Sequence, residues 1–277
     1  MLKKKKWKKQ TTKKDNHNGG YENAMMTTGE HLEVLRQMLF RVLAVSGVIT
    51  LLVFCFKDST WQLLLAPSEW DFFTYRWIES FMQSMGIDFH FKEFHVEMIA
   101  TDLSSQFMTH ISTAVYLGLL GTSPYILYEL FRFISPALYE NERKYSVQVA
   151  GIIYVLFLLG VLMSYFVLFP ISFRFLGTYS VSEKVVSNIT LDSYISTFVS
   201  LTLVMGVVFQ LPVIAFFLGK MRIVTSDMLA RYRKHSFIVI MIIAAIITPP
   251  DLMTLILVTI PLYLLYELSV RVVCWTE

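Results

Sequence analysis

Residues Val147–Phe169 read VQVAGIIYVLFLLGVLMSYFVLF, a run of 23 residues without a charged side chain. A helix needs about 20 mostly apolar residues to cross the roughly 30 Å hydrocarbon core of a bilayer. This run therefore predicts a transmembrane helix, which Pro170 is expected to close because proline has no N–H for the helix ladder. The composition agrees, since 55% of the residues are hydrophobic and 16% are charged, against about 25% charged in a soluble domain.

Five other stretches are apolar enough to suggest spans. They are predicted at about residues 39–56, 111–127, 194–218, 236–248 and 252–268. Pro124 is expected to break the second span of the chain near its end. The predicted fold class is all-α, a polytopic membrane helical bundle with six transmembrane helices.

The last two predicted spans are short. Only Pro249, Pro250 and Asp251 separate them, which predicts a tight hairpin with Asp251 capping the helix that follows. A re-entrant pair that does not cross the membrane is the alternative for these two helices.

Positive charge is distributed unevenly around the six predicted spans. The segments on the side of the two termini carry 19 Lys and Arg residues, and those on the other side carry 5. Connections rich in Lys and Arg stay on the cytoplasmic side, so both termini are expected there. Residues 1–30, with eight lysines between Lys3 and Lys14, are predicted to form a basic, disordered arm that touches anionic lipid. Binding of cargo or of a ribosome is the alternative for this arm.

Motifs of several functional classes are missing. The sequence has no GxxxxGK[ST] phosphate loop, no HExxH motif and no GxSxG motif. Cys55 and Cys274 are expected on opposite sides of the membrane, so a disulfide between them is excluded. We therefore predict no enzyme activity, no cofactor, no metal site and no nucleic-acid partner.

Acidic residues occur in two stretches expected at the cytoplasmic surface: Glu30 and Glu33 before the first span, and Glu140 and Glu142 after the second. Carboxylates at an interface can bind guanidinium groups in bidentate, charge-assisted pairs. The alternative is local pairing with Arg36, Arg143 and Lys144 on a solvated helix face.

Five motifs in this chain resemble those of one family. The run FISPALYENER, from Phe133 to Arg143, is similar to the loop signature FxxPxLxxxE[RK] of the TatC family, the receptor subunit of the twin-arginine protein translocase. Four further similarities follow the order of that family, at residues 31–36, 123–128, 248–251 and 261–267. Together they delimit a TatC-like membrane domain over about residues 31–273.

The resemblance implies a receptor for folded precursor proteins that carry an N-terminal Arg-Arg signal. It implies that Glu142, flanked by Glu140 and Arg143, pairs with one signal arginine. The family's N-terminal glutamate falls on Val34 here, so Glu33 or Glu30 is left as the acid for the second arginine. The implied partners are TatA- and TatB-like single-span subunits in a homo- or hetero-oligomer, and the implied energy source is the proton-motive force.

Polar residues within the predicted spans are the remaining candidates. Gln210, two residues before Pro212, is expected to face protein or a wet cavity, and the resemblance implies contact with a single-span subunit. The alternative is hydrogen bonding between helices. Two family polar positions are lost, at Ser112 and Leu255.

Two acidic residues near span ends are predicted to form ion pairs within their own helices. Glu129 is spaced for Arg132, and Glu267 for Arg271.

Two other functions are compatible with a helical membrane protein. One is a secondary transporter for a small solute, which needs convergent polar groups near the midplane. The other is an assembly factor that binds no cargo. The host membrane is expected to be a bacterial cytoplasmic membrane, a mitochondrial inner membrane or a thylakoid membrane.

Overall fold

The computed structural model describes residues 28–88, 90–134, 146–180, 182, 188–248 and 251–276. Several residues of the sequence predictions lie outside this part of the chain: Glu140, Glu142, Arg143, Lys144, Pro249 and Pro250, together with residues 1–27 of the predicted basic arm. The same holds for the side chain of Glu30.

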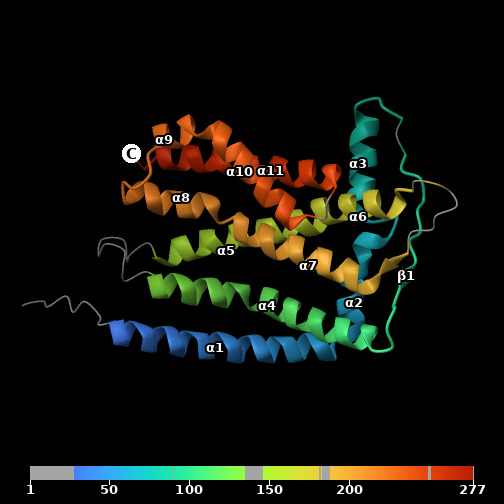
Figure 1. Cartoon of the computed structure of the whole chain (residues 1–277), viewed down its shortest axis with the longest axis horizontal. Helices are drawn as coiled ribbons and strands as arrows, with labels where there is room; N and C mark the ends of the chain where they lie inside the picture. The colour runs from blue at the N-terminus through green and yellow to red at the C-terminus, as the bar shows by residue number, and fades with distance from the viewer. Residues whose placement is uncertain are drawn as a thin grey trace, which may run out of the picture.

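Long helices run beside one another through the molecule (Figure 1). They are α1 (Thr28–Cys55), α4 (Ser105–Ile134), α5 (Ser146–Met163), α6 (Phe169–Thr178), α7 (Leu191–Val208), α8 (Leu211–Lys220), α10 (Arg233–Ile247) and α11 (Leu252–Cys274). A π-helical segment, η4 (Ser164–Leu168), joins α5 to α6.

Among the residues that the structure describes, four helical stretches have the length and hydropathy of a membrane span. They are Leu32–Cys55, Val149–Thr178, Leu191–Lys220 and Leu252–Cys274, with mean hydropathy of 2.3, 2.6, 2.4 and 1.8. Helix α10 has only 15 residues, and α4 contains Gly, Thr, Ser and Pro among its apolar residues. The chain is therefore a helical membrane protein, and the count of six crossings stays a prediction.

The two ends of the helical bundle differ in structure. The start of α1, the end of α4, the start of α5 and the end of α11 lie together, and we call this the terminal end (Figure 1). The opposite end, the cap end, holds α2 (Lys57–Leu65), η1 (Ala66–Ser68), α3 (Phe73–Ser84) and the parallel pair β1 (Met98–Ile99) and β2 (Ile189–Thr190). Cys55 and Cys274 end helices at opposite ends, and both are free.

Two predicted helix breaks at proline are wrong. Helix α4 continues through Pro124 to Ile134. The third span continues past Pro170 to Thr178 through the π-helical segment. Proline 170 leaves the carbonyl oxygen of Phe166 without its i+4 donor, and the hydroxyl of Thr74 in α3 donates to that oxygen.

The last helical hairpin differs from the prediction in length. Helix α11 has 23 residues, or about 34 Å at 1.5 Å per residue, which is enough to span. Helix α10 is short, with 15 residues, or about 22 Å. Asp251 caps α11 as predicted, because its Oδ1 accepts from the Thr254 N–H at 2.7 Å.

Small residues allow the helices to approach closely. A Cβ on Gly118 of α4 would lie 2.9 Å from the Cα of Thr50 in α1, and one on Gly160 of α5 would lie 3.0 Å from the Cα of Gly206 in α7. Helix packing in membranes depends on such contacts because lipid tails are as apolar as the side chains. These contacts hold α1 on α4 and α5 on α7, and thereby position the terminal end.

The core lies where α5, η4, α6 and α7 meet the cap. Buried aromatic rings pack edge to face there, including Phe169 against Tyr194 with centroids 4.9 Å apart. Tyr194 also donates from its hydroxyl to the Leu64 carbonyl of α2 at 2.7 Å, so the cap is fixed to the bundle.

Candidate functional site

Glu33 lies on the first turns of α1, at the terminal end. Its carboxylate is 3.6 Å from the Arg36 guanidinium, and Gln37 donates to it at 3.3 Å. All three side chains are exposed. The local pairing with Arg36 that the sequence allowed is therefore present, but an exposed pair contributes only about 0–1 kcal/mol and can yield to another guanidinium.

The helices on either side of the acidic connection, α4 and α5, reach the same end of the molecule as the start of α1 (Figure 1). The last described residue of α4, Ile134, and the first of α5, Ser146, lie at the terminal end together with the start of α1 (Figure 1). Glu140, Glu142 and Arg143 fall between them, outside the described residues. Their role, like that of Glu30, stays a prediction.

A buried carboxylate links α1 to α4. Glu129 has a side chain only 7% exposed, and its Oε1 lies 3.4 Å from Nη1 of Arg41. The hydroxyl of Tyr125 donates to the same oxygen at 3.0 Å. The predicted pairing with Arg132 is wrong. Glu129 lies on the face of α4 that packs against α1, whereas Arg132 is exposed.

A second cluster of the same composition links α10 to α11. Glu267 accepts from Nε of Arg233 at 2.8 Å and from its Nη2 at 3.0 Å. Tyr263, four residues earlier, donates to Glu267 at 3.2 Å. The predicted pairing with Arg271 is wrong for the same reason, since the partner arginine comes from the neighbouring helix.

The sequence did not predict that either cluster joins two helices, although it contains one indication of such a contact. Arg41 is a lone charge near the start of an apolar span, and such a charge requires a partner. A tyrosine four residues before a glutamate occurs in both α4 and α11. The pattern indicates an anchored carboxylate but does not identify the helix that supplies the arginine.

Gln210 lies at the joint between α7 and α8. Its Nε2 donates to the Ile153 carbonyl of α5 at 3.1 Å and to the Gly206 carbonyl at 3.4 Å. Its Oε1 is buried without a hydrogen-bond partner in the described part of the chain. Pro212 is buried in the first turn of α8. The contact between helices is thus present, and contact with another subunit stays a prediction.

The two lost polar positions differ in surroundings. Ser112 is exposed on α4, and Leu255 is partly buried on α11, packed against the core. Within the described residues, no group of three His, Cys, Asp or Glu side chains is arranged to hold a metal ion.

Comparison with known proteins gives a consistent picture. Residues 30–261 match the family model of the Sec-independent protein translocase protein TatC. A TatC protein from Blattabacterium sp. subsp. Periplaneta americana is 33% identical over 255 residues, which is 91% of this chain and 96% of that protein. TatCy of Bacillus subtilis is 39% identical over 173 residues, covering 62% of this chain and 68% of its own.

A solved structure has the same fold. A crystal structure of the twin-arginine translocase receptor TatC superposes with a TM-score of 0.70 at 29% identity, covering 89% of this chain and 99% of that one. The family model covers most of the chain, and a relative 33% identical is covered almost entirely, so this chain belongs to the TatC family of Sec-independent protein translocase components.

Proposed function

We propose that this protein binds the Arg-Arg signal peptides of folded precursors at its terminal end, which faces the cytoplasm. Glu142 binds one signal arginine, and Glu33 or Glu30 binds the other. The observation that carries the proposal is the convergence of α1, α4 and α5 at that end (Figure 1). The helices on either side of the second acidic stretch therefore have their ends at the same end of the molecule as the helix that carries Glu33.

The electrostatics of Glu33 support this role. Its partner Arg36 is on the same helix and both side chains are exposed, at 55% and 68%. An incoming guanidinium can form two parallel hydrogen bonds with a carboxylate, whereas Arg36 makes a single contact at 3.6 Å. Exchange of the local pair for the signal arginine is therefore favourable.

The proposal extends to assembly and energy supply. Single-span TatA- and TatB-like subunits contact the bundle near Gln210, whose buried Oε1 lacks a hydrogen-bond donor among the described residues. Transport uses the proton-motive force, because the sequence has no nucleotide-binding motif. The host membrane is a bacterial cytoplasmic membrane or an organellar inner or thylakoid membrane.

The first test reverses the charge of Glu142. We expect Glu142→Lys to abolish crosslinking of an Arg-Arg precursor peptide in membrane vesicles, since a lysine repels the guanidinium. The matched control is Glu93→Lys, because Glu93 is an exposed acidic residue of the cap end. This variant should bind the precursor peptide like the parent protein. Undiminished crosslinking by Glu142→Lys would contradict the proposal.

The second arginine is assigned by a separate comparison. Glu33→Gln and Glu30→Gln should each be tested against peptides with Arg-Lys and Lys-Arg signals. The residue that contacts the second arginine should lose its effect when that arginine is already replaced. If the two variants change the binding of all peptides equally, neither residue recognises the second arginine. The proposal that α1 is part of the binding surface would then be wrong.

A further inference from the structure

Helix α3 lies across the long helices of the bundle and not along them (Figure 1). It belongs to the cap end and has 12 residues, which cover about 18 Å at 1.5 Å per residue. A helix of that length is too short to cross about 30 Å of hydrocarbon. Helix α3 is therefore not a span, and its exposed surface has a different role from the surfaces of the spans.

One side of α3 is an aromatic stripe. Phe73, Trp77 and Phe81 are spaced four residues apart, so they share one face of the helix. Each has more than half of its surface exposed, and the rings of Trp77 and Phe81 stack with centroids 5.8 Å apart. Met85 continues the same spacing just after the helix and is also exposed. Such a group of exposed apolar side chains indicates a surface that binds another apolar phase.

The opposite side of α3 is fixed to the protein. The hydroxyl of Tyr75 donates to the Pro170 carbonyl at 2.8 Å. Glu79, one turn later, accepts from the Phe91 N–H at 2.6 Å. At 3.6 residues per turn, Tyr75 lies about 160° around the helix from both Phe73 and Trp77. The aromatic stripe therefore points away from the side that binds the cap.

Contacts with the third span show which way the stripe faces. The ring of Phe73 packs edge to face on that of Phe166 in η4, with centroids 6.0 Å apart. Tyr75 reaches Pro170 instead, which lies about 6 Å further along the span toward the cap end. The Phe73 side of α3 therefore faces the middle of the membrane, and the Tyr75 side faces the cap.

The same span gives the depth of α3 in the bilayer. The apolar stretch of this span begins at Val149, and Phe166 lies about 26 Å from it along the helix. In a hydrocarbon core about 30 Å thick, this position is near the outer edge. Arg174 lies about 12 Å beyond Phe166, outside the hydrocarbon, where a charge is tolerated. The stripe is thus at the boundary between acyl chains and headgroups.

A third side of α3 is polar. Arg76 and Gln83 are exposed, and Arg76 lies 3.4 Å from the carboxylate of Asp71. Arg76 is about 100° around the helix from Trp77, and Gln83 is about 160° from Phe81. A helix with separate apolar and polar sides is typical of the membrane interface, where tryptophan is enriched.

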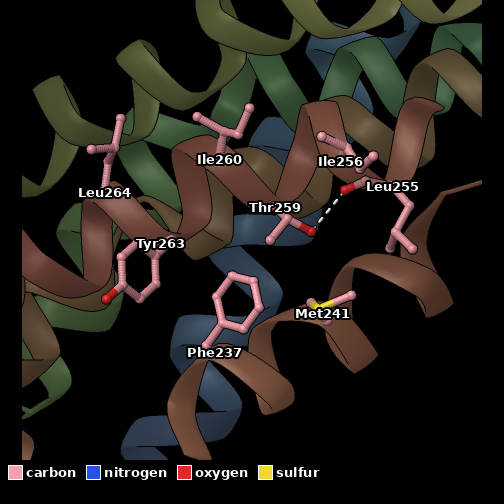
Figure 2. A pocket seen from close by; sticks show the side chains of 8 residues that line it. All are labelled: Phe237, Met241, Leu255, Ile256, Thr259, Ile260, Tyr263 and Leu264. Carbon is pink, nitrogen blue, oxygen red and sulfur yellow. Dashed lines mark hydrogen bonds between the residues drawn. The ribbon is translucent and has the colours of Figure 1, made fainter. Parts of the chain in front are cut away.

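Exposure alone does not distinguish α3 from the surfaces of the long helices. The groove between α10 and α11 is also apolar, and Phe237, Thr259 and Tyr263 are among the residues that line it (Figure 2). Its two helices run with the bundle, whereas α3 lies across it (Figure 1). The orientation of α3, together with the contact between Phe73 and Phe166, is the observation that sets its stripe apart.

We infer that α3 lies in the membrane surface at the cap end, with Phe73, Trp77 and Phe81 inserted between the headgroups and the acyl chains. The partner of the stripe is the lipid of the host bilayer. Phe166 makes the stripe continuous with the apolar surface of the third span. Helix α3 thereby fixes the height of the cap over the bilayer. This inference does not depend on the signal-binding proposal, which concerns the terminal end.

Nitroxide labels can measure which side of α3 meets lipid. Single cysteines replace Trp77 or Phe81 on the stripe, and Arg76 or Gln83 on the polar side, in protein from which both native cysteines have been removed. The labelled protein is reconstituted in phospholipid vesicles. Labels at Trp77→Cys and Phe81→Cys should collide more with oxygen, which partitions into acyl chains, than with a water-soluble nickel chelate. Labels at Arg76→Cys and Gln83→Cys should show the reverse.

Two further labels calibrate the measurement. Leu159→Cys, on an exposed apolar position of α5, gives the value for lipid, and Glu93→Cys, on an exposed position of the cap, gives the value for water. If the stripe labels collide mainly with the nickel chelate, α3 lies in water and the inference is wrong. If the stripe labels are shielded from both reagents, protein covers the stripe, and the inference is equally wrong.

A second experiment removes the aromatic side chains. With the nitroxide at Ser84→Cys, beside the stripe, the triple variant Phe73→Ser/Trp77→Ser/Phe81→Ser should lower collisions with oxygen and raise those with the nickel chelate. The matched control Gln83→Ser, on the polar side of the helix, should leave both unchanged. Unaltered collisions in the triple variant would show that the aromatic rings do not hold α3 in the bilayer, against the inference.

Discussion

Arg222 adopts a left-handed conformation just after α8, with φ of 56°. The hydrogen bonds there are those of a Schellman motif: the Ile223 N–H donates to the Leu218 carbonyl at 3.0 Å, and the Arg222 N–H to the Gly219 carbonyl at 2.8 Å. Helix α3 ends with the same motif, but Gly86 takes the left-handed position there, with φ of 77°. Glycine lacks the Cβ that makes this conformation costly for arginine.

We therefore expect Arg222→Gly to raise the stability of the protein. Relief of the left-handed strain, about 1–2 kcal/mol, exceeds the entropy that glycine adds to the unfolded chain, about 0.4–1 kcal/mol. Thermal unfolding in detergent measures the change. Arg222→Ala, which removes the charge but keeps a Cβ, is the control and should show no gain. If alanine and glycine stabilise equally, charge and not backbone strain is the cause.

Pairs of neighbouring helices are joined by arginine, glutamate and tyrosine at two places. Arg41 reaches Glu129 from α1 to α4, and Arg233 reaches Glu267 from α10 to α11. The spacing rules of a single helix gave the wrong partner in both cases, because contacts between residues distant in sequence decided which face each glutamate presents. A lone charge such as Arg41 in an apolar span requires a partner, but the sequence does not show where in the chain that partner lies.

Replacing Arg41 alone should destabilise the α1–α4 contact. Among the described residues, Arg41→Leu leaves the buried Glu129 carboxylate with only Tyr125 as a donor, at a cost of about 1–3 kcal/mol for an uncompensated group. The double variant Arg41→Leu/Glu129→Gln removes the charge and should recover most of the loss. Unfolding of the purified variants in detergent compares the two. A double variant no more stable than the single one would show that the arginine contributes by packing and not by charge.

Local sequence rules also failed to predict where a helix ends at proline. The third span was predicted to end at Pro170, and it continues because Thr74 of α3 donates to the freed carbonyl of Phe166. That donor belongs to the cap, far away in sequence. Local propensity could identify the missing N–H but not its replacement, whereas the Asp251 cap, which acts within three residues, was predicted correctly.

The cap is held to the bundle through a cation enclosed by aromatic rings. The guanidinium of Arg174 in α6 lies 5.1 Å from the ring centre of Tyr75, 4.3 Å from that of Phe91 and 4.6 Å from that of Phe94. It also donates to the Lys92 carbonyl at 2.8 Å. Burial next to these rings raises the pKa of Tyr75 above its ordinary value, so its hydroxyl stays protonated and donates to the Pro170 carbonyl at 2.8 Å.

Arg174→Leu should loosen the segment 90–98 without unfolding the bundle. Each cation–π contact contributes about 0.5–2 kcal/mol, and the Lys92 carbonyl loses its donor. Hydrogen exchange followed by mass spectrometry should show faster exchange in this segment and unchanged exchange in α7. Arg174→Lys, which keeps the charge but not the planar stacking surface, should lie between leucine and the parent. Uniformly faster exchange would assign Arg174 to global stability instead.

At the scale of the whole molecule, sequence patterns predicted the class of protein better than its details. Apolar runs and motif order correctly predicted a helical membrane protein of the TatC family. The cap could not be assembled from the sequence, because its contacts join α2 to α7, α3 to α6 and β1 to β2. Such long-range contacts have no local periodicity.

The parallel pairing of Met98 with Ile189 and of Ile99 with Thr190 has a consequence for biogenesis. Strand β1 leaves the ribosome well before its partner, which follows only after α4, α5 and α6 have been synthesised. The exposed edge of β1 must therefore wait for membrane insertion of those helices before it is sealed. A polypeptide halted before residue 189 therefore lacks the partner strand for this edge.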